Sequence, residues 1–269
     1  MKKSKLFHLK NEMLVANVIA NFIGVFLAIV LIHRTEPFPN ELYDNPIIYW
    51  TDALFDPFAF SFVIVMTLLY EKPIRHYLNA LSRRTSIPQD LKLKARQQLL
   101  NEPFVLIALD FSIWVLWAIV WSTIQWAYDS GSQLVQRSLY NGLSIGLITV
   151  TVAFFFLEHL LQKRLAPYFF PDGGLSTIPK TLRIRIRTRL VALLFACNLI
   201  PLISIIVILN GISGSKHEPA LALAKLQSAI NINALIFIGV GICLTILVSR
   251  NLSIPFRDII QTLRRIRNG

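Results

Sequence analysis

Charged residues are scarce in this chain, which has 269 residues and carries Asp, Glu, Lys or Arg at only 16% of them. A typical soluble domain carries about 25% charged residues. Hydrophobic residues make up 54% of the sequence, and the mean hydropathy is +0.56. The composition therefore argues against a soluble globular protein, and the 11% of aromatic residues excludes a disordered chain.

Cysteine is also rare, because the chain has only Cys197 and Cys243, and both lie within apolar segments. This excludes a disulfide-built secreted scaffold and a cysteine-rich metal site. Common enzyme motifs are missing too, since the sequence has no H-E-x-x-H, no P-loop and no G-x-G-x-x-G. No two of the five histidines are four residues apart. We therefore expect no catalytic residues, no cofactor and no metal site in this chain.

What the sequence does have is long apolar segments. Six of them cover residues 13–32, 53–70, 103–125, 139–161, 190–210 and 229–249. The hydrocarbon core of a bilayer, about 30 Å thick, is crossed by roughly 20 helical residues. We therefore expect an all-α membrane protein with six transmembrane helices.

The basic residues predict how these helices are oriented. All but four of the 27 lysines and arginines fall in the N-terminal tail, the loops after the second and fourth spans, and the C-terminal tail. With six spans these four segments lie on one side, which the positive-inside rule makes cytoplasmic. We expect a multi-pass membrane protein with both termini cytoplasmic. The same distribution accounts for the net charge of +12, so membrane lipids rather than nucleic acid are the expected partners.

The third span carries an unusual polar and aromatic face. Its members, spaced by four, three, four and four residues, are Asp110, Trp114, Trp117, Trp121 and Gln125. An acid within a membrane is costly and indicates a function by default. The face could line a lipophilic pocket with Asp110 at its inner end. Alternatively it is a packing stripe in which a neighbouring span satisfies Asp110.

Two other spans carry faces of small and amide residues. They are Asn17, Asn21, Gly24 and Ala28 in the first span, and Gly142, Gly146, Thr149 and Ala153 in the fourth. Such residues let helices approach closely in lipid, so we expect them to pack the bundle together. Glu158, near the inner end of the fourth span, is expected to pair with a basic residue, and a polar functional site is the alternative.

The cytoplasmic loops predict the domain organisation. Ser86 and Gln89 resemble a capping box, which predicts a separate helix at about 87–100 that either lies on the inner leaflet or is a solvated connector. Residues 167–189 form a basic linker rich in proline and glycine. This linker divides a four-span part, residues 1–166, from a two-span hairpin, residues 190–249.

Residues 250–269 follow the last span with a heptad pattern. Its apolar positions, spaced by four, three, four and three residues, are Leu252, Phe256, Ile259, Leu263 and Ile266, and we call them the heptad seam. A seam of this spacing needs a partner helix, so we expect a homodimer. We also expect the helix to continue directly from span six.

The same stretch resembles the first helix of a HAMP domain. The resemblance is carried by Ser253-Ile254-Pro255-Phe256-Arg257-Asp258 after Arg250, and by Arg264, Arg265 and Gly269 at the close. The order of the six spans is similar to the membrane part of bacterial six-span class III adenylate or guanylate cyclases with a HAMP domain. The resemblance implies dimerisation through span six and the HAMP helix, with the rest of HAMP and an output domain outside this chain.

The function expected from this resemblance is that of a membrane sensor and anchor in signal transduction. A membrane or extracellular signal would pass along the last helix to a cytoplasmic cyclase. A small six-span permease or channel subunit would show the same charge distribution, and a plain membrane anchor is a further alternative. The ligand is left open by the sequence.

Overall fold

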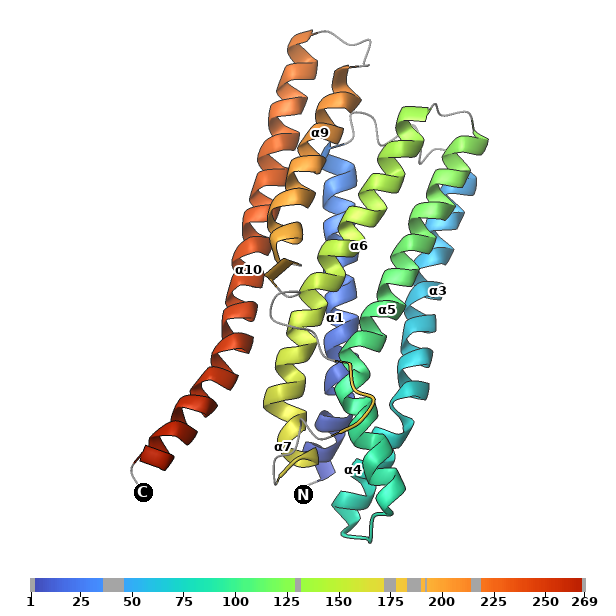
Figure 1. The fold of residues 1–269 in the computed structure, drawn as a ribbon. Coiled ribbons are helices and arrows are strands. Elements are labelled where there is room, and N and C mark those ends of the chain that lie inside the picture. Colours follow the sequence, from blue (N-terminus) through green and yellow to red (C-terminus); the bar gives the residue numbers. More distant parts are fainter. Residues whose placement is uncertain are drawn as a thin grey trace.

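The computed structural model describes residues 3–35, 46–128, 132–171, 178–182, 190–191, 193–213 and 219–267 (Figure 1). Within these ranges all regular structure is helical, which confirms the predicted all-α class. The elements are α1 (Lys3–Thr35), α3 (Pro46–Tyr70), α4 (Lys72–Arg83), α5 (Gln89–Ala127), α6 (Ser132–Leu160), η1 (Leu161–Leu165), α7 (Ala166–Phe169), η3 (Phe195–Leu199), α9 (Ile200–Ser213) and α10 (Pro219–Arg267).

Five helical stretches are long and apolar enough to cross a membrane. They are Phe7–Val30, Tyr49–Tyr70, Gln89–Ala127, Ser138–Phe169 and Leu226–Arg250. The predicted fifth span, residues 190–210, contributes a shorter apolar stretch, Phe195–Ile206, and its residue 192 lies outside the described residues. Length and composition thus identify five membrane-crossing helices in the described part of the chain.

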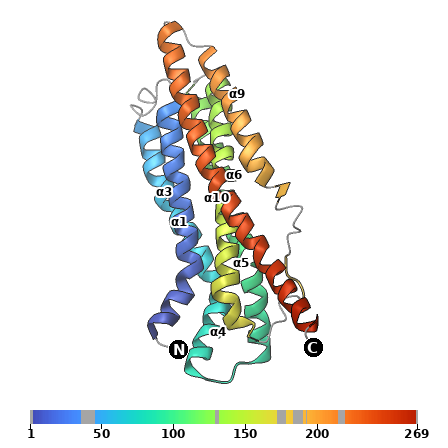
Figure 2. The same ribbon diagram turned by 90° about the vertical axis from the view of Figure 1, so that its left-hand side faces the viewer.

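The long helices lie side by side in an elongated bundle, and both chain ends lie at the same end of it (Figures 1 and 2). Helix α6 is central, because it contacts α1, α5, α9 and α10. Helix α3 packs only against α1, α4 and α5 among the pairs with substantial contact. Helix α10 packs against α9, α6 and α1, and its C-terminal part leans away from the bundle (Figure 1).

Glycines set the distance between α6 and its neighbours. A Cβ atom on Gly146 would lie 2.6 Å from Trp114 Cβ of α5, and one on Gly142 would lie 2.8 Å from Ala118 Cβ. On α1, a Cβ on Gly24 would lie 2.5 Å from Thr149 Oγ1 of α6. The faces of small residues therefore serve close helix packing, as predicted.

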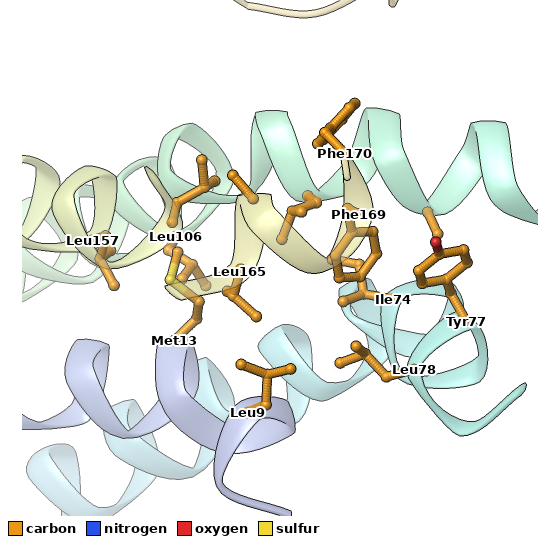
Figure 3. Close-up of a cluster of buried hydrophobic side chains, with 14 of the residues drawn as sticks. Leu9, Met13, Ile74, Tyr77, Leu78, Leu106, Leu157, Leu165, Phe169 and Phe170 are labelled. Carbon is orange, nitrogen blue, oxygen red and sulfur yellow. The ribbon is translucent and has the colours of Figure 1, made fainter. Parts of the chain in front are cut away.

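A buried hydrophobic cluster joins the helices at the end of the bundle that holds α4 and α7 (Figure 3). Leu9 and Met13 of α1 meet Leu78 of α4, and the rings of Tyr77 and Phe169 stack with centroids 4.5 Å apart. The remaining buried members are Ala16, Ile74, Ala95, Leu99, Leu106, Leu157, Leu161, Leu165, Ala166, Phe170 and Ile178. Six elements, α1, α4, α5, α6, η1 and α7, are fixed together here by apolar burial.

The helix predicted at about 87–100 is not separate. Helix α5 runs from Gln89 through Pro103 to Ala127, so the predicted helix and the third span are one element. Pro88, not Ser86, is the N-cap residue, and no side chain caps this helix, so the predicted capping box is wrong. The face containing Ala95 and Leu99 is buried in the cluster of Figure 3 rather than lying on a leaflet or in solvent.

The loops after the second and fourth spans contain helices that the sequence did not predict. The loop after the second span contains α4, whose Ile74, Tyr77 and Leu78 are buried. The loop after the fourth span begins as helix, because η1 and α7 continue α6 to Phe169. The first residues of the predicted linker 167–189 therefore belong to the packed core, while residues 172–177 and 183–189 lie outside the described residues.

We predict that Gly146→Ala lowers the free energy of unfolding by about 1–3 kcal/mol, because the new methyl group would overlap Trp114. Gly239→Ala is the matched control, since a Cβ there meets nothing within 4 Å. The measurement is denaturant or thermal unfolding of both purified variants in the same detergent. Equal stabilities would show that the glycine does not set the spacing of α5 and α6.

Candidate functional site

Asp110 is buried inside the bundle, with 1% of its surface exposed. Asn17 Nδ2 of α1 donates to Asp110 Oδ1 at 3.1 Å, and Asn21 also bonds to the carboxyl group. Asn21 Nδ2 donates in addition to the Asn17 carbonyl oxygen at 3.1 Å. Amide donors of α1 therefore bind the carboxyl group and tie α5 to α1, while Asp110 Oδ2 has no hydrogen-bond partner among the described residues.

The tryptophan face of α5 packs mainly against α6. Trp114 and Trp117 lie over Gly146 and Gly142, with their ring centroids 6.3 Å apart. Trp121 is buried next to Trp117, with centroids 5.9 Å apart. At the far end of the face, Ser138 Oγ of α6 donates to Gln125 Oε1 at 2.8 Å. The five predicted residues share one face, and its tryptophans and glutamine pack against α6.

A cavity of about 510 Å³ lies beside this face, between α1, α3 and α5. Trp114 and Trp117 form part of its wall, whereas Asp110, Trp121 and Gln125 are not among its lining residues. Asn21 lines it and links it to the Asp110 hydrogen bonds. The predicted pocket residues are thus divided between a cavity wall and a helix interface.

Other predicted positions lie apart from this cavity. Glu158 is buried near the C-terminal end of α6. The heptad seam and Pro255 lie on α10, which is helical through Arg267, but their side chains lie outside the described ones. Asp56 and Pro57 lie within α3, because that helix begins at Pro46.

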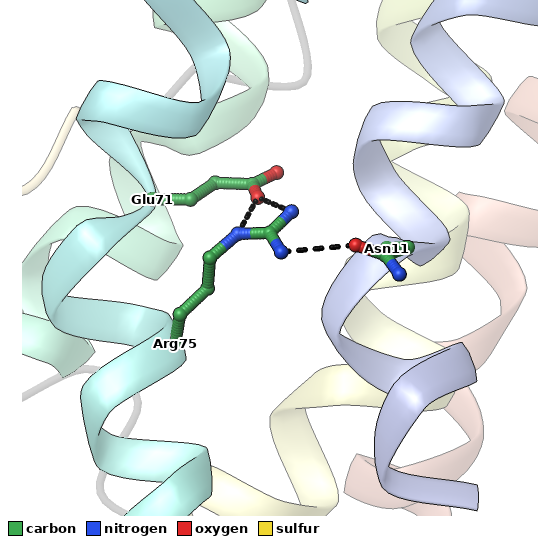
Figure 4. A network of polar contacts seen from close by, with 3 residues as sticks. All are labelled: Asn11, Glu71 and Arg75. Carbon is green, nitrogen blue, oxygen red and sulfur yellow. Dashed lines mark hydrogen bonds and ion pairs between the residues drawn. The ribbon is translucent and has the colours of Figure 1, made fainter. Parts of the chain in front are cut away.

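A second polar cluster escaped the sequence analysis. It joins α1, α4 and α5 just beyond the apolar part of α3 (Figure 4). Glu71 and Glu102 are 2% and 1% exposed, and their carboxyl groups are in hydrogen-bonding contact. Arg75 Nε donates to Glu71 Oε2 at 2.7 Å, and Arg75 Nη1 donates to Asn11 Oδ1 at 2.9 Å.

The contact between the two carboxyl groups requires a proton, because two carboxylates can only accept hydrogen bonds. Arg75 pairs with Glu71 and keeps it ionised, so Glu102 is the member that donates. Burial raises the pKa of Glu71, while the contacts with Glu102 and Arg75 oppose that rise. The cluster is therefore a proton-holding carboxyl pair with one cationic partner.

A sequence signal for Glu102 existed in the periodicity of α5. Ala95, Leu99, Glu102 and Leu106 follow one another at steps of four, three and four residues, and all are buried. Glu102 directly precedes Pro103, where the third span was predicted to begin, so it was left outside the predicted span. Continuing the apolar face past the proline would have placed the acid in the core.

Comparison with known proteins gives no relative, because no family model, curated protein or solved structure matches the chain.

We predict that Glu102→Gln removes the pH dependence of stability that the carboxyl pair causes. Because Glu102 holds a proton in its contact with Glu71, the folded pair keeps a proton that the unfolded chain releases above the ordinary glutamate value of 4.5. The free energy of unfolding of the wild type should therefore fall as the pH rises from that value into the alkaline range. Glutamine mimics the protonated Glu102, so the variant should match the wild type at acidic pH and exceed it at alkaline pH.

The measurement is thermal unfolding between pH 5 and 9, with exposed Asp90 changed to Asn as the control. Glu71→Gln should instead lower stability at every pH by about 1–3 kcal/mol, because Arg75 loses its ionised partner. Parallel pH profiles for the wild type and Glu102→Gln would contradict the shared proton.

Proposed function

We propose that this chain is the membrane sensor and anchor module of a bacterial signal-transduction protein. In this proposal it lies in the inner membrane as a six-span homodimer with both termini cytoplasmic. Its last helix passes a signal to a cytoplasmic output domain, and the HAMP resemblance makes an adenylate or guanylate cyclase the favoured output. The observation that carries the proposal is the continuity of α10 from Pro219 to Arg267.

A continuous helix is a suitable transmitter. Helix α10 contains the apolar stretch Leu226–Arg250 and continues for 17 further residues to Arg267, through the heptad seam. At 1.5 Å per residue its 49 residues extend about 73 Å, well beyond a bilayer core of about 30 Å. Because no break separates the two parts, rotation or tilt of the membrane part would move the cytoplasmic part with it.

The exposed residues in the membrane part of α10 support dimerisation through the helix face that carries the heptad seam. The heptad seam consists of Leu252, Phe256, Ile259, Leu263 and Ile266. Its spacing continues unchanged from Leu252 towards the N-terminus of α10, into the membrane part of the helix. The positions it reaches are Leu235, Ile238, Ile242, Thr245 and Ser249, and all five are exposed on the bundle. By contrast, Leu244 and Val248 are buried against the rest of the chain. A second copy of α10 would cover this exposed row.

The location of the basic residues supports the proposed orientation. Helix α4, at the end of the bundle that holds both chain ends (Figures 1 and 2), carries Lys72, Arg75 and Arg83, and Lys10 of α1 bonds to Asn79 of the same helix. Basic residues concentrate on the cytoplasmic side of membrane proteins. That end would therefore face the cytoplasm, where an output domain could follow α10.

We predict disulfide crosslinking between copies along the α10 row. In a background with Cys197→Ser and Cys243→Ser, Ile242→Cys should form covalent dimers in membranes under mild oxidation, because two such residues would face each other. Leu244→Cys is the matched control, since its side chain is fully buried within one chain. The readout is the dimer band in non-reducing electrophoresis. Equal crosslinking at both positions would argue against a dimer through α10.

We also predict a helical-phase dependence of signalling. The chain is fused in frame to a complete HAMP domain and a class III cyclase, and residues are inserted after Arg250. Three inserted residues should change the basal cyclase activity severalfold, because they rotate the two parts of α10 against each other. Seven should restore it, because they preserve the heptad.

Unchanged activity in both insertion variants would indicate a plain anchor. Substrate flux in liposomes by the unfused chain would favour a permease instead.

A further inference from the structure

The cavity between α1, α3 and α5 lies in the half of the bundle away from the chain ends, and it has features of a ligand site. Its volume of about 510 Å³ is within the range of about 300–1,000 Å³ typical of small-molecule pockets. Its lining is mainly apolar, with Val25, Ile29 and Val63 among the contributing residues. Such a lining accepts a lipophilic molecule.

The cavity wall contains an acidic group. Among the described residues that line it, Asp56 of α3 is the charged one. Asn21 is a second polar group in the wall, and its Nδ2 already donates within the protein, which leaves Oδ1 to accept. Both groups favour a positively charged or hydrogen-bond-donating ligand.

Aromatic rings complete the wall. They belong to Tyr49, Phe55, Phe60, Trp114 and Trp117. A cation over an aromatic face gains about 0.5–2 kcal/mol, with tryptophan the strongest partner. These rings are held in place, because Trp114 packs on Gly146 and Phe60 stacks on Phe22 with centroids 4.5 Å apart. A pre-formed wall of this kind reduces the entropy lost when a ligand binds.

The cavity can be reached from the lipid side. Ala53 lines it and is also exposed on the outer surface of α3, and Leu54 beside it is 65% exposed. A molecule dissolved in the bilayer would therefore meet the opening laterally. This route requires a lipophilic body as well as a charge.

We propose that the cavity binds a lipophilic organic cation, with its charge between Asp56 and the ring faces of Trp114 and Trp117. The proposal deepens the sensor function and rests on it only for the consequence of binding. Occupancy would couple α3, the least enclosed helix, to α1 and α5. Those two helices in turn contact α6, and α1 contacts α10.

The test uses the full chain in nanodiscs of phosphatidylcholine, with tetraphenylphosphonium as the probe. Equilibrium dialysis measures its saturable binding after subtraction of empty nanodiscs. Tetraphenylborate, which has the same shape and the opposite charge, is the matched ligand. We expect saturable binding of the phosphonium and none of the borate.

Variants locate the site. Asp56→Asn should weaken phosphonium binding by at least about tenfold, which corresponds to about 1.4 kcal/mol. Asp90→Asn, an exposed aspartate distant from the cavity lining, should leave binding unchanged. Ala53→Trp should block the cavity from the lipid side and abolish binding, whereas Leu54→Trp, at the adjacent position outside the lining, should not.

Equal binding of phosphonium and borate would overturn the proposal, as would no saturable binding or full affinity in Asp56→Asn. Should Asp56→Asn fail to fold, the Ala53→Trp and Leu54→Trp pair decides the outcome. The binding assay involves no output domain, so its failure is distinguishable from failure of the proposed signalling role. The helical-phase experiment tests that role separately.

Discussion

The close approach of α6 to α5 and α1 is the constraint on which the rest of the bundle depends. In lipid, apolar side chains gain little by leaving their surroundings, so packing contacts rather than hydrophobic burial hold helices together. Gly142 and Gly146 provide the space into which Trp117 and Trp114 fit, and Gly24 gives Thr149 the same space on α1. The cavity follows from this arrangement, because the tryptophans pack on α6 and also present part of their surface to α3.

Buried carboxyl groups at two positions along the bundle specify which helices pack together. Asp110 is held by Asn17 and Asn21 in the middle of the bundle, and Glu102 meets Glu71 near the end that holds α4. Each carboxyl group bonds to a different helix, so each specifies which helices are neighbours. A buried acid without such a donor would cost several kcal/mol, roughly the whole stability of many domains. The hydrophobic cluster of Figure 3 then fixes the helix ends by ordinary apolar burial.

The sequence predicted the all-α class, and five of its six spans correspond to helices long and apolar enough to cross a membrane, because long apolar segments carry a strong signal. It predicted the packing role of Gly142 and Gly146, and the continuous helix from span six into residues 250–267 is observed as well. It was wrong about the separate helix at 87–100, because Pro103 was taken as a boundary, whereas α5 runs through it.

The carboxyl pair was missed for a different reason. Glu71 and Glu102 are 31 residues apart and meet only through the fold, so neither shows a local pattern that names the other. The division of the tryptophan face between a cavity wall and a helix interface has the same origin. The division depends on where α3 and α6 lie around α5, and the periodicity of α5 alone does not give the positions of other helices.

The unbroken course of α5 has a consequence for how this chain can change over evolutionary time. Glu102, Asp110 and Trp114 stand on one rod, in which each residue advances the direction of a side chain by about 100°. Deleting any single residue between Glu102 and Trp114 would rotate one part of α5 by about 100° relative to the other. The residue of the carboxyl pair and the residue of the cavity wall would then point in different directions. Insertions and deletions in this stretch are therefore excluded unless they come in near-integral numbers of turns.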